Sequence, residues 1–116
     1  MSVLAQVTDE HHGDVPVVAS AGEIDASNAR EIADRLRAAL SNRSAALVVD
    51  LSGTTYIDSA GLNILFELSV ALRERQQELH LVVAQPSPIA RMVAIVGLDA
   101  AVATHPTRAG ALDALG

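Results

Sequence analysis

Residues 46–72, ALVVDLSGTTYIDSAGLNILFELSVAL, carry the strongest structural signal in the chain. The first six of them form a short apolar, β-branched run, which is typical of a strand covered on both faces. Strands of this kind run parallel in sheets that are flanked by helices. We therefore expect the functional residues to follow the carboxyl end of this strand.

Beyond that run, a polar loop over residues 52–57 is predicted to lead to Asp58 and Ser59, which open an apolar helix that continues to about Arg75. Acidic and hydroxyl side chains are favoured at helix starts, because they accept hydrogen bonds from unpaired backbone N–H groups. Ser59 would thus lie at the positive end of a helix dipole, where an added phosphate is tolerated. A capping role alone would also explain both residues.

This helix has two apolar sides at about 100° per residue. The side predicted to face the sheet carries Gly61, Ile64, Leu65, Leu68 and Leu72. Leu62, Phe66 and Val70 are spaced by four and form a separate stripe. The stripe either packs on a neighbouring helix or forms a partner-binding surface that begins at Ser59, with Leu62 as its main contact.

The remaining segments predict further alternation of strands and helices. Strands are expected at residues 3–8, 15–21, 79–84 and 101–104, with a hairpin connection at 9–14. Helices are expected from Asp25, as N-cap, to about residue 42, at 89–96 before Gly97, and at the end of the chain. This order predicts a mixed sheet with right-handed crossovers between its parallel strands.

The composition narrows the functional classes. The 116 residues fit one domain, 1–116, and its core must be aliphatic because Tyr56 and Phe66 are the only aromatic residues. A net charge of -6 argues against a nucleic-acid surface and favours a cationic partner. The absence of cysteine excludes disulfides and thiolate-bound zinc, and His11 with His12 lacks an obvious third metal ligand, so no metal site is predicted.

Targeting and nucleotide-binding motifs are also missing from the sequence. Asp9 and Glu10 come too early for a secretory signal, and no apolar run approaches the length of a bilayer span, so a cytoplasmic protein is expected. The chain contains no lysine, so it has no phosphate-binding loop of the G-x-x-x-x-G-K-S/T type. We expect no cofactor.

Three motifs resemble one known family. Asp58-Ser59-Ala60-Gly61-Leu62 after a buried strand is similar to the phosphorylation motif of the STAS family, specifically of its anti-sigma factor antagonists. Gly22-Glu23-Ile24-Asp25 resembles the segment that opens the first helix of that family, and Met92-Val93-Ala94-Ile95-Val96-Gly97-Leu98 resembles its late helix. The matches follow the order of the family and span nearly the whole chain.

The resemblance implies an α/β fold, a STAS-like mixed β-sheet of four to five strands with about four helices, mainly packed on one face. It also implies a regulatory cycle. The unphosphorylated protein, monomeric when free, binds an anti-sigma factor serine kinase and frees a sigma factor. The kinase uses its own ATP to phosphorylate Ser59, and a metal-dependent serine phosphatase removes the phosphate.

The same resemblance assigns no catalytic residue. Asp25, Asp58 and Gly61 are implied as neighbours of the phosphoacceptor Ser59. Asp25 would lie beside the Ser59 loop because both follow strands at the same edge of the sheet. The implied partner-binding residues are Ala60, Leu62, Asn63 and Phe66.

Two alternative functions remain open from the residues. A STAS subunit of a membrane transporter, either a lipid-exporting ABC system or an anion permease, can retain such a motif without a kinase. A serine hydrolase with Ser59 as nucleophile fits less well, since Ile57 stands where the G-x-S-x-G elbow needs glycine. Neither His80 nor His105 has a sequence context that would make it the required base.

Overall fold

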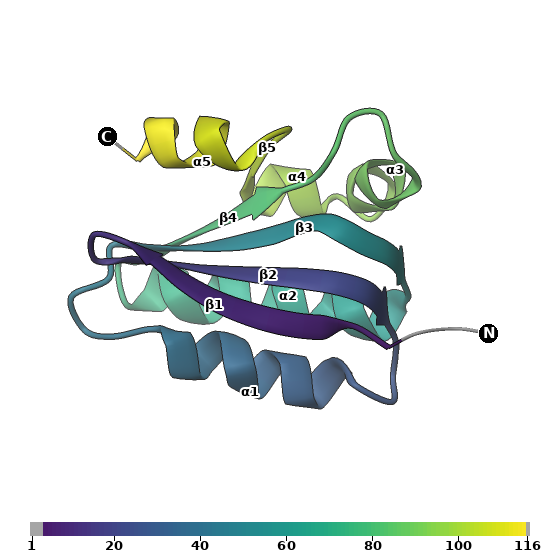
Figure 1. The fold of residues 1–116 in the computed structure, drawn as a ribbon, viewed down its shortest axis with the longest axis horizontal. Coiled ribbons are helices and arrows are strands. Elements are labelled where there is room, and N and C mark those ends of the chain that lie inside the picture. The colour runs from purple at the N-terminus through teal and green to yellow at the C-terminus, as the bar shows by residue number, and fades with distance from the viewer. Residues whose placement is uncertain (1–3, 116) are drawn as a thin grey trace.

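A mixed sheet forms the centre of the molecule, as predicted (Figure 1). Within the computed structural model, which describes residues 4–115, five strands pair in the order β1-β2-β3-β4-β5. They are β1 (Gln6–His12), β2 (Val15–Ile24), β3 (Ala46–Ile57), β4 (Glu78–Val82) and β5 (Ala103–His105). β1 is antiparallel to β2, and the other three pairs are parallel.

Helices follow the parallel strands and bury their apolar sides against the sheet. Those in the described residues are α1 (Ala29–Ala39), α2 (Ser59–Glu74), α3 (Pro88–Ile95), α4 (Leu98–Ala101) and α5 (Arg108–Ala114). Apolar side chains from α1, α2, α3 and α4 join one large core cluster with the strands. These four helices fit the expected packing on mainly one face.

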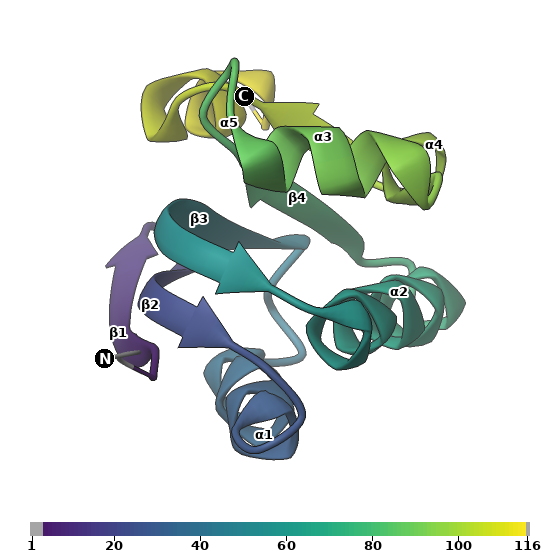
Figure 2. The ribbon, with the colours of Figure 1, turned by 90° about the vertical axis from the view of Figure 1, so that its right-hand side faces the viewer.

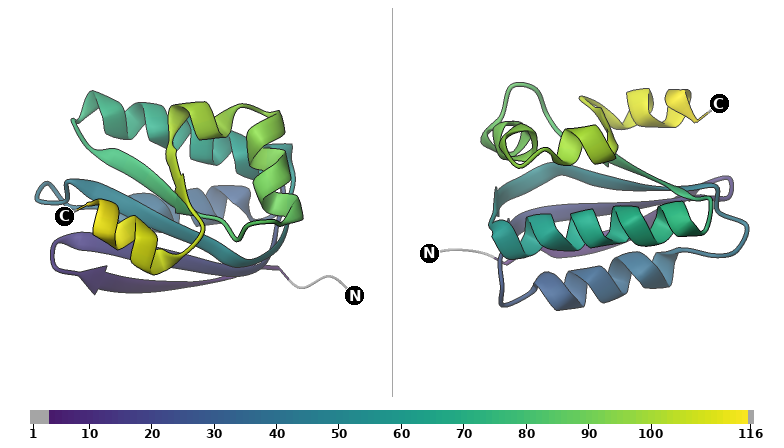
Figure 3. Two further views of the ribbon diagram at one scale, coloured as in Figure 1. Left: turned by 90° about the horizontal axis from the view of Figure 1, so that it is seen from above. Right: turned by 180° about the vertical axis from the view of Figure 1, so that it is seen from behind.

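The opposite face of the sheet has a much smaller core. Successive residues of a strand point to opposite faces, so Val18 joins the large cluster while Val17 faces the other way. Val17, Val48 and Val82 pack there under Ala111 of α5. Figures 1 and 3 show α5 on the side of the sheet away from α1. α5 is the helix expected at the end of the chain, whereas α4 is the one helix of the described residues that was not expected, so that five stand where about four were predicted.

The core is aliphatic, as the composition predicts. Leu36, Leu47 and Leu81 are among the fully buried side chains. Both aromatic residues lie on the surface, with Tyr56 48% exposed and Phe66 41% exposed. The aromatic side chains are thus available for contacts outside the core.

The predicted loop at residues 52–57 is wrong, because β3 continues through it to Ile57. β2 is extended in the same way to Ile24, past the predicted end at residue 21. The two strands stay paired in parallel to their last residues, Ile24 with Ile57, and both of these side chains are buried. Burial at the end of the pair stabilises the longer strands.

The first hairpin is also longer than predicted. β1 runs through Asp9 and Glu10, which the sequence assigned to the connection, and Val3, the first residue of the predicted strand, lies outside the described residues. Charged side chains suit a strand at the edge of a sheet. Gly13 has a left-handed backbone, with φ of 64°, and makes the tight turn to β2 possible.

The predicted strand at residues 101–104 begins two residues later than expected. Gly97, with φ of 78°, ends α3 and allows the chain to enter α4 at once. Leu98 is then fully buried, and α4 occupies the residues up to Ala101. β5 is consequently confined to Ala103–His105 at the edge of the sheet.

Candidate phosphorylation and partner-binding site

Ser59 is the first residue of α2 and is exposed to solvent. Asp58, one residue earlier, is the N-cap of the helix. Its Oδ1 atom accepts hydrogen bonds from the backbone N–H groups of Ala60 at 3.0 Å and Gly61 at 3.2 Å. Because Asp58 supplies the cap, the Ser59 hydroxyl is not needed to begin the helix.

The Asp58 carboxylate also holds the connection between β2 and α1. Its Oδ2 atom accepts a hydrogen bond from the backbone N–H of Ala26 at 3.2 Å. The backbone N–H of Asp58 donates to the carbonyl oxygen of Ile24 at 3.2 Å. The connection that contains Asp25 is therefore in contact with the start of α2, as expected for two segments that follow neighbouring parallel strands.

The prediction that Asp25 caps α1 is wrong. A turn separates it from the helix, which begins at Ala29 with Asn28 in the N-cap position. The side chain of Asp25 instead accepts hydrogen bonds from the Ser27 hydroxyl at 2.5 Å and the Ser27 N–H at 2.8 Å. These bonds hold the pKa of Asp25 below its ordinary value, so its carboxylate is charged at neutral pH.

Gly61 brings the first turn of α2 close to the ends of β2 and β3. A Cβ atom at this position would lie 2.7 Å from Ile57 Cγ1 and 2.8 Å from Ile24 Cγ2. Real Cβ atoms essentially never approach other atoms so closely. The glycine thus sets the position of Ser59 relative to the sheet.

The four predicted partner-binding residues differ in their accessibility. Asn63 and Phe66 are exposed, and Ala60 is half-buried. Leu62 is 5% exposed and belongs to the large core cluster, so its placement on an exposed stripe is wrong. The cluster includes side chains of α3 and α4 as well, so Leu62 is buried in a core that neighbouring helices share.

The rest of that stripe stays on the surface. Phe66 and Val70 are 41% and 44% exposed. Arg73, which borders them, donates a hydrogen bond to the carbonyl oxygen of Ala101 at 3.0 Å and thereby joins α2 to α4. The accessible apolar contacts on this side of α2 are therefore those of Phe66 and Val70.

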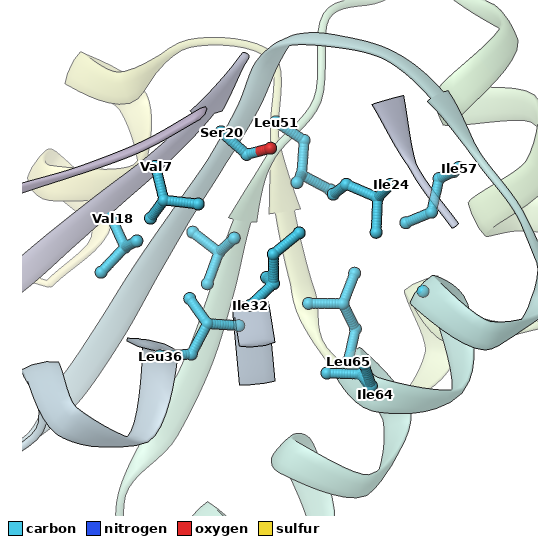
Figure 4. Close-up of a pocket in the computed structure, with 12 residues that line it drawn as sticks. Val7, Val18, Ser20, Ile24, Ile32, Leu36, Leu51, Ile57, Ile64 and Leu65 are labelled. Carbon is cyan, nitrogen blue, oxygen red and sulfur yellow. The ribbon is translucent and has the colours of Figure 1, made fainter. Parts of the chain in front are cut away.

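An apolar pocket lies between the sheet and helices α1 and α2 (Figure 4). Its walls include Val7, Ile32, Ile57 and Leu65, and the side chain of Ser20 points into it. The Ser20 hydroxyl has no hydrogen-bond partner among the described residues. A free volume of about 10 Å³ accommodates no more than a water molecule, so this pocket is part of the core.

The two histidines considered as catalytic bases contact each other. His80 Nδ1 and His105 Nε2 are 3.0 Å apart, and the two rings are stacked. They lie on β4 and β5, whereas Ser59 follows β3. Burial and the charge of His80 both lower the pKa of His105. A Ser-His pair of the hydrolase type has no support in this arrangement.

In the described part of the chain, no three His, Cys, Asp or Glu side chains come together in a way that could hold a metal ion. None of the helices within residues 4–115 has both the length and the apolar character needed to cross a membrane.

Comparison with known proteins decides the family. The family described as "Mlab, STAS domain" matches residues 7–104. The chain belongs to the STAS domain family. This match contains all of the residues considered above for the site, from Asp25 to Phe66.

Relatives of this STAS domain include named regulators. It is 33% identical over 93 residues to the anti-sigma-F factor antagonist RsfB of Mycobacterium tuberculosis, covering 80% of this chain and 75% of that protein. It is 35% identical over 81 residues to the anti-sigma-B factor antagonist of Listeria monocytogenes, covering 70% of this chain and 68% of that protein.

The fold is also similar to a solved structure. The crystal structure of an anti-sigma factor antagonist from Mycobacterium paratuberculosis superposes with a TM-score of 0.86 at 30% identity. The superposition covers 98% of this chain and 97% of that one. The arrangement of the five strands and five helices within residues 4–115 is thus that of a STAS domain.

Proposed function

We propose that this STAS domain is an anti-sigma factor antagonist that is controlled by phosphorylation of Ser59. The exposed Ser59 hydroxyl at the start of α2, with the cap already supplied by Asp58, is the observation that carries the proposal. Two relatives and a structural neighbour that bear the name of such antagonists support it. The role is regulatory rather than catalytic.

A phosphate on Ser59 would change the charge of this surface without breaking the helix. The dipole of α2 favours negative charge at its amino end. The added group carries about −1.5 to −2 charges at neutral pH. The ionised Asp25 and the Asp58 carboxylate belong to segments in contact there, so the phosphate would concentrate negative charge beside Ser59.

The partner that fits this chemistry is an anti-sigma factor with serine kinase activity. The chain has no lysine and no phosphate-binding loop, so the ATP would be bound by the kinase. In the unphosphorylated state, the antagonist would occupy the kinase and release its sigma factor. A metal-dependent phosphatase would return Ser59 to the active state.

The proposal can be tested with the anti-sigma-F factor of Mycobacterium tuberculosis as the probe. The purified chain would be incubated with this factor and ATP, and the modified residue located by mass spectrometry. Phosphate on Ser59, absent in the Ser59→Ala variant, supports the proposal. Phosphate only on Ser52, Thr54 or Thr55, or the absence of a complex, contradicts it.

A second measurement distinguishes the transporter alternative. Native co-purification from the cells of origin would identify a soluble kinase complex or a membrane complex. A complex with transporter subunits, together with an unmodified Ser59, would contradict the kinase cycle and support a role in transport.

A further inference from the structure

A surface groove runs between α1 and α2, which lie side by side (Figures 2 and 3). Its volume is about 340 Å³. Small side chains line it: Ala29 and Ala33 on α1, and Ala60 on α2. Short side chains allow the backbone of another segment to approach closely, as at other close helix contacts.

One end of the groove is next to the phosphoacceptor. Ala26 and Ala60 both line it, and the hydrogen bond from Ala26 N–H to Asp58 joins the turn before α1 to the start of α2 there. Ser59 directly precedes Ala60 and is exposed. Ser59 itself does not line the groove, but a phosphate on it would be attached one residue from the lining residue Ala60, at this end of the groove.

The α1 wall of the groove carries Arg30 and Arg37, both exposed. They are seven residues apart, which corresponds to about 10 Å along a helix. Two other arginines are in ion pairs: Arg35 with Asp9 at 3.3 Å, and Arg108 with Glu10 at 2.8 Å.

Within residues 4–115, neither Arg30 nor Arg37 has a carboxylate within 4.0 Å, although Asp34 lies between them in sequence and Glu67 lines the α2 wall. The groove thus presents two unpaired cationic side chains in a chain of net charge -6. Carboxylates on a segment that fills the groove would complement these two side chains.

We propose that the groove binds an acidic helical segment of the anti-sigma partner, with two carboxylates seven residues apart that pair with Arg30 and Arg37. This inference rests on the proposed function and names the surface that carries it out. Arginine is suited to the task because its planar guanidinium binds carboxylates through two parallel hydrogen bonds. The alanine-lined floor lets such a helix approach α1 and α2.

The same arrangement gives phosphorylation a physical effect on binding. A phosphate on Ser59 would repel an acidic segment that extends toward this residue. The phosphate charge would lower the affinity of an apolar segment much less. The groove therefore explains why a single modification at Ser59 could dissociate a partner that contacts both helices.

The test uses charge reversal with a matched control. Dissociation constants would be measured calorimetrically for the anti-sigma-F factor of Mycobacterium tuberculosis with the wild-type chain, Arg30→Glu/Arg37→Glu and Arg30→Gln/Arg37→Gln. Arg43→Glu is the control, since Arg43 is exposed and lies in the connection between α1 and β3. Thermal unfolding of each variant would confirm its fold.

We expect charge reversal to raise the Kd at least tenfold, the glutamine variant to raise it less, and Arg43→Glu to change it less than twofold. The salt dependence of Kd should also be weaker in both groove variants. Equal binding by the wild-type chain and the charge-reversed variant would overturn the groove assignment and leave the proposed function intact. No binding by the wild-type chain would overturn both.

Discussion

Asp58 Oδ2 accepts a hydrogen bond from the backbone N–H of Ala26 at 3.2 Å, although the two residues are 32 positions apart. With its other oxygen, the same carboxylate caps α2. One side chain therefore joins the start of α2 to the turn that precedes α1, the two helices that flank the proposed groove. Its removal should affect stability and the relative position of the two helices together.

Asp58→Ala should lower the free energy of unfolding by about 1 to 2 kcal/mol, because an N-cap and a link to α1 are lost. Asp58→Asn keeps an accepting oxygen and should recover most of this loss. Urea unfolding would measure the free energy of unfolding of both variants, with Asp34→Ala, a substitution at an exposed position, as the control. Identical midpoints for the wild-type chain and Asp58→Ala would show that this carboxylate does not support the helix starts.

Substitution of Ser59 separates a switch from a structural residue. Ser59→Ala should unfold within about 0.5 kcal/mol of the wild-type chain, because Asp58 remains as the cap. It should bind the partner constitutively. Ser59→Asp places negative charge at the amino end of a helix and should also fold, yet bind more weakly. Calorimetric titration of both variants with the anti-sigma factor would compare them, and equal affinities would contradict the switch.

Leu62 and Phe66 should respond in opposite ways to truncation. Leu62→Ala removes a side chain that is only 5% exposed, so it should cost about 2 to 5 kcal/mol of stability. Phe66→Ala should cost less, since its ring is 41% exposed, and should weaken partner binding. Denaturant unfolding and Kd measurements on both variants test this assignment. A Leu62→Ala protein of wild-type stability but reduced affinity for the partner would show that Leu62 contacts the partner.

Gly61→Ala tests the close approach of α2 to the sheet. At an exposed helix position, this change usually stabilises by about 0.5 to 1 kcal/mol, because alanine is the better helix former. Here the new Cβ would be 2.7 Å from Ile57 and 2.8 Å from Ile24, and crowding typically costs about 1 to 3 kcal/mol. We expect net destabilisation in thermal unfolding. A higher melting temperature would show that the contact is easily relaxed.

The pair of histidines predicts a loss of stability in mild acid. Burial and the charge of His80 lower the folded-state pKa of His105 below its ordinary value of about 6.5. The unfolded chain then binds more protons than the folded one as pH falls below this value, so stability decreases toward acid. Unfolding free energies at pH 7.5 and 5.5 should differ less in His105→Gln than in the wild-type chain. His11→Gln, in an exposed part of β1, is the control, and an unchanged difference in His105→Gln would refute the assignment.

Local patterns in the sequence were sufficient for the start of the central strand and for the helix that follows it, although not for the second half of the strand. The start of the apolar run at Ala46 and the bounds of α2 agree with the structure. Asp58, directly before Ser59, caps the helix, as its residue type indicates. These features depend on interactions between residues that are close in sequence, and such interactions are visible in spacing and residue type.

Three other features required the tertiary structure: the burial of Leu62, the bonding of Asp25, and the groove between α1 and α2. The sequence left open whether the stripe of Leu62 is buried or exposed, and in the structure Leu62 belongs to a core cluster to which α3 and α4 also contribute. Asp25 bonds to Ser27 instead of capping α1, because a turn intervenes before Ala29.

The groove with Arg30 and Arg37 carries no signal in the sequence. It forms only because β2 and β3 are parallel neighbours, which sets α1 beside α2 and joins Asp58 to Ala26. The sequence alone thus determined the helix start that presents Ser59. The surface around that serine was decided by the packing of segments distant in sequence, because burial and charge pairing depend on which elements meet in space.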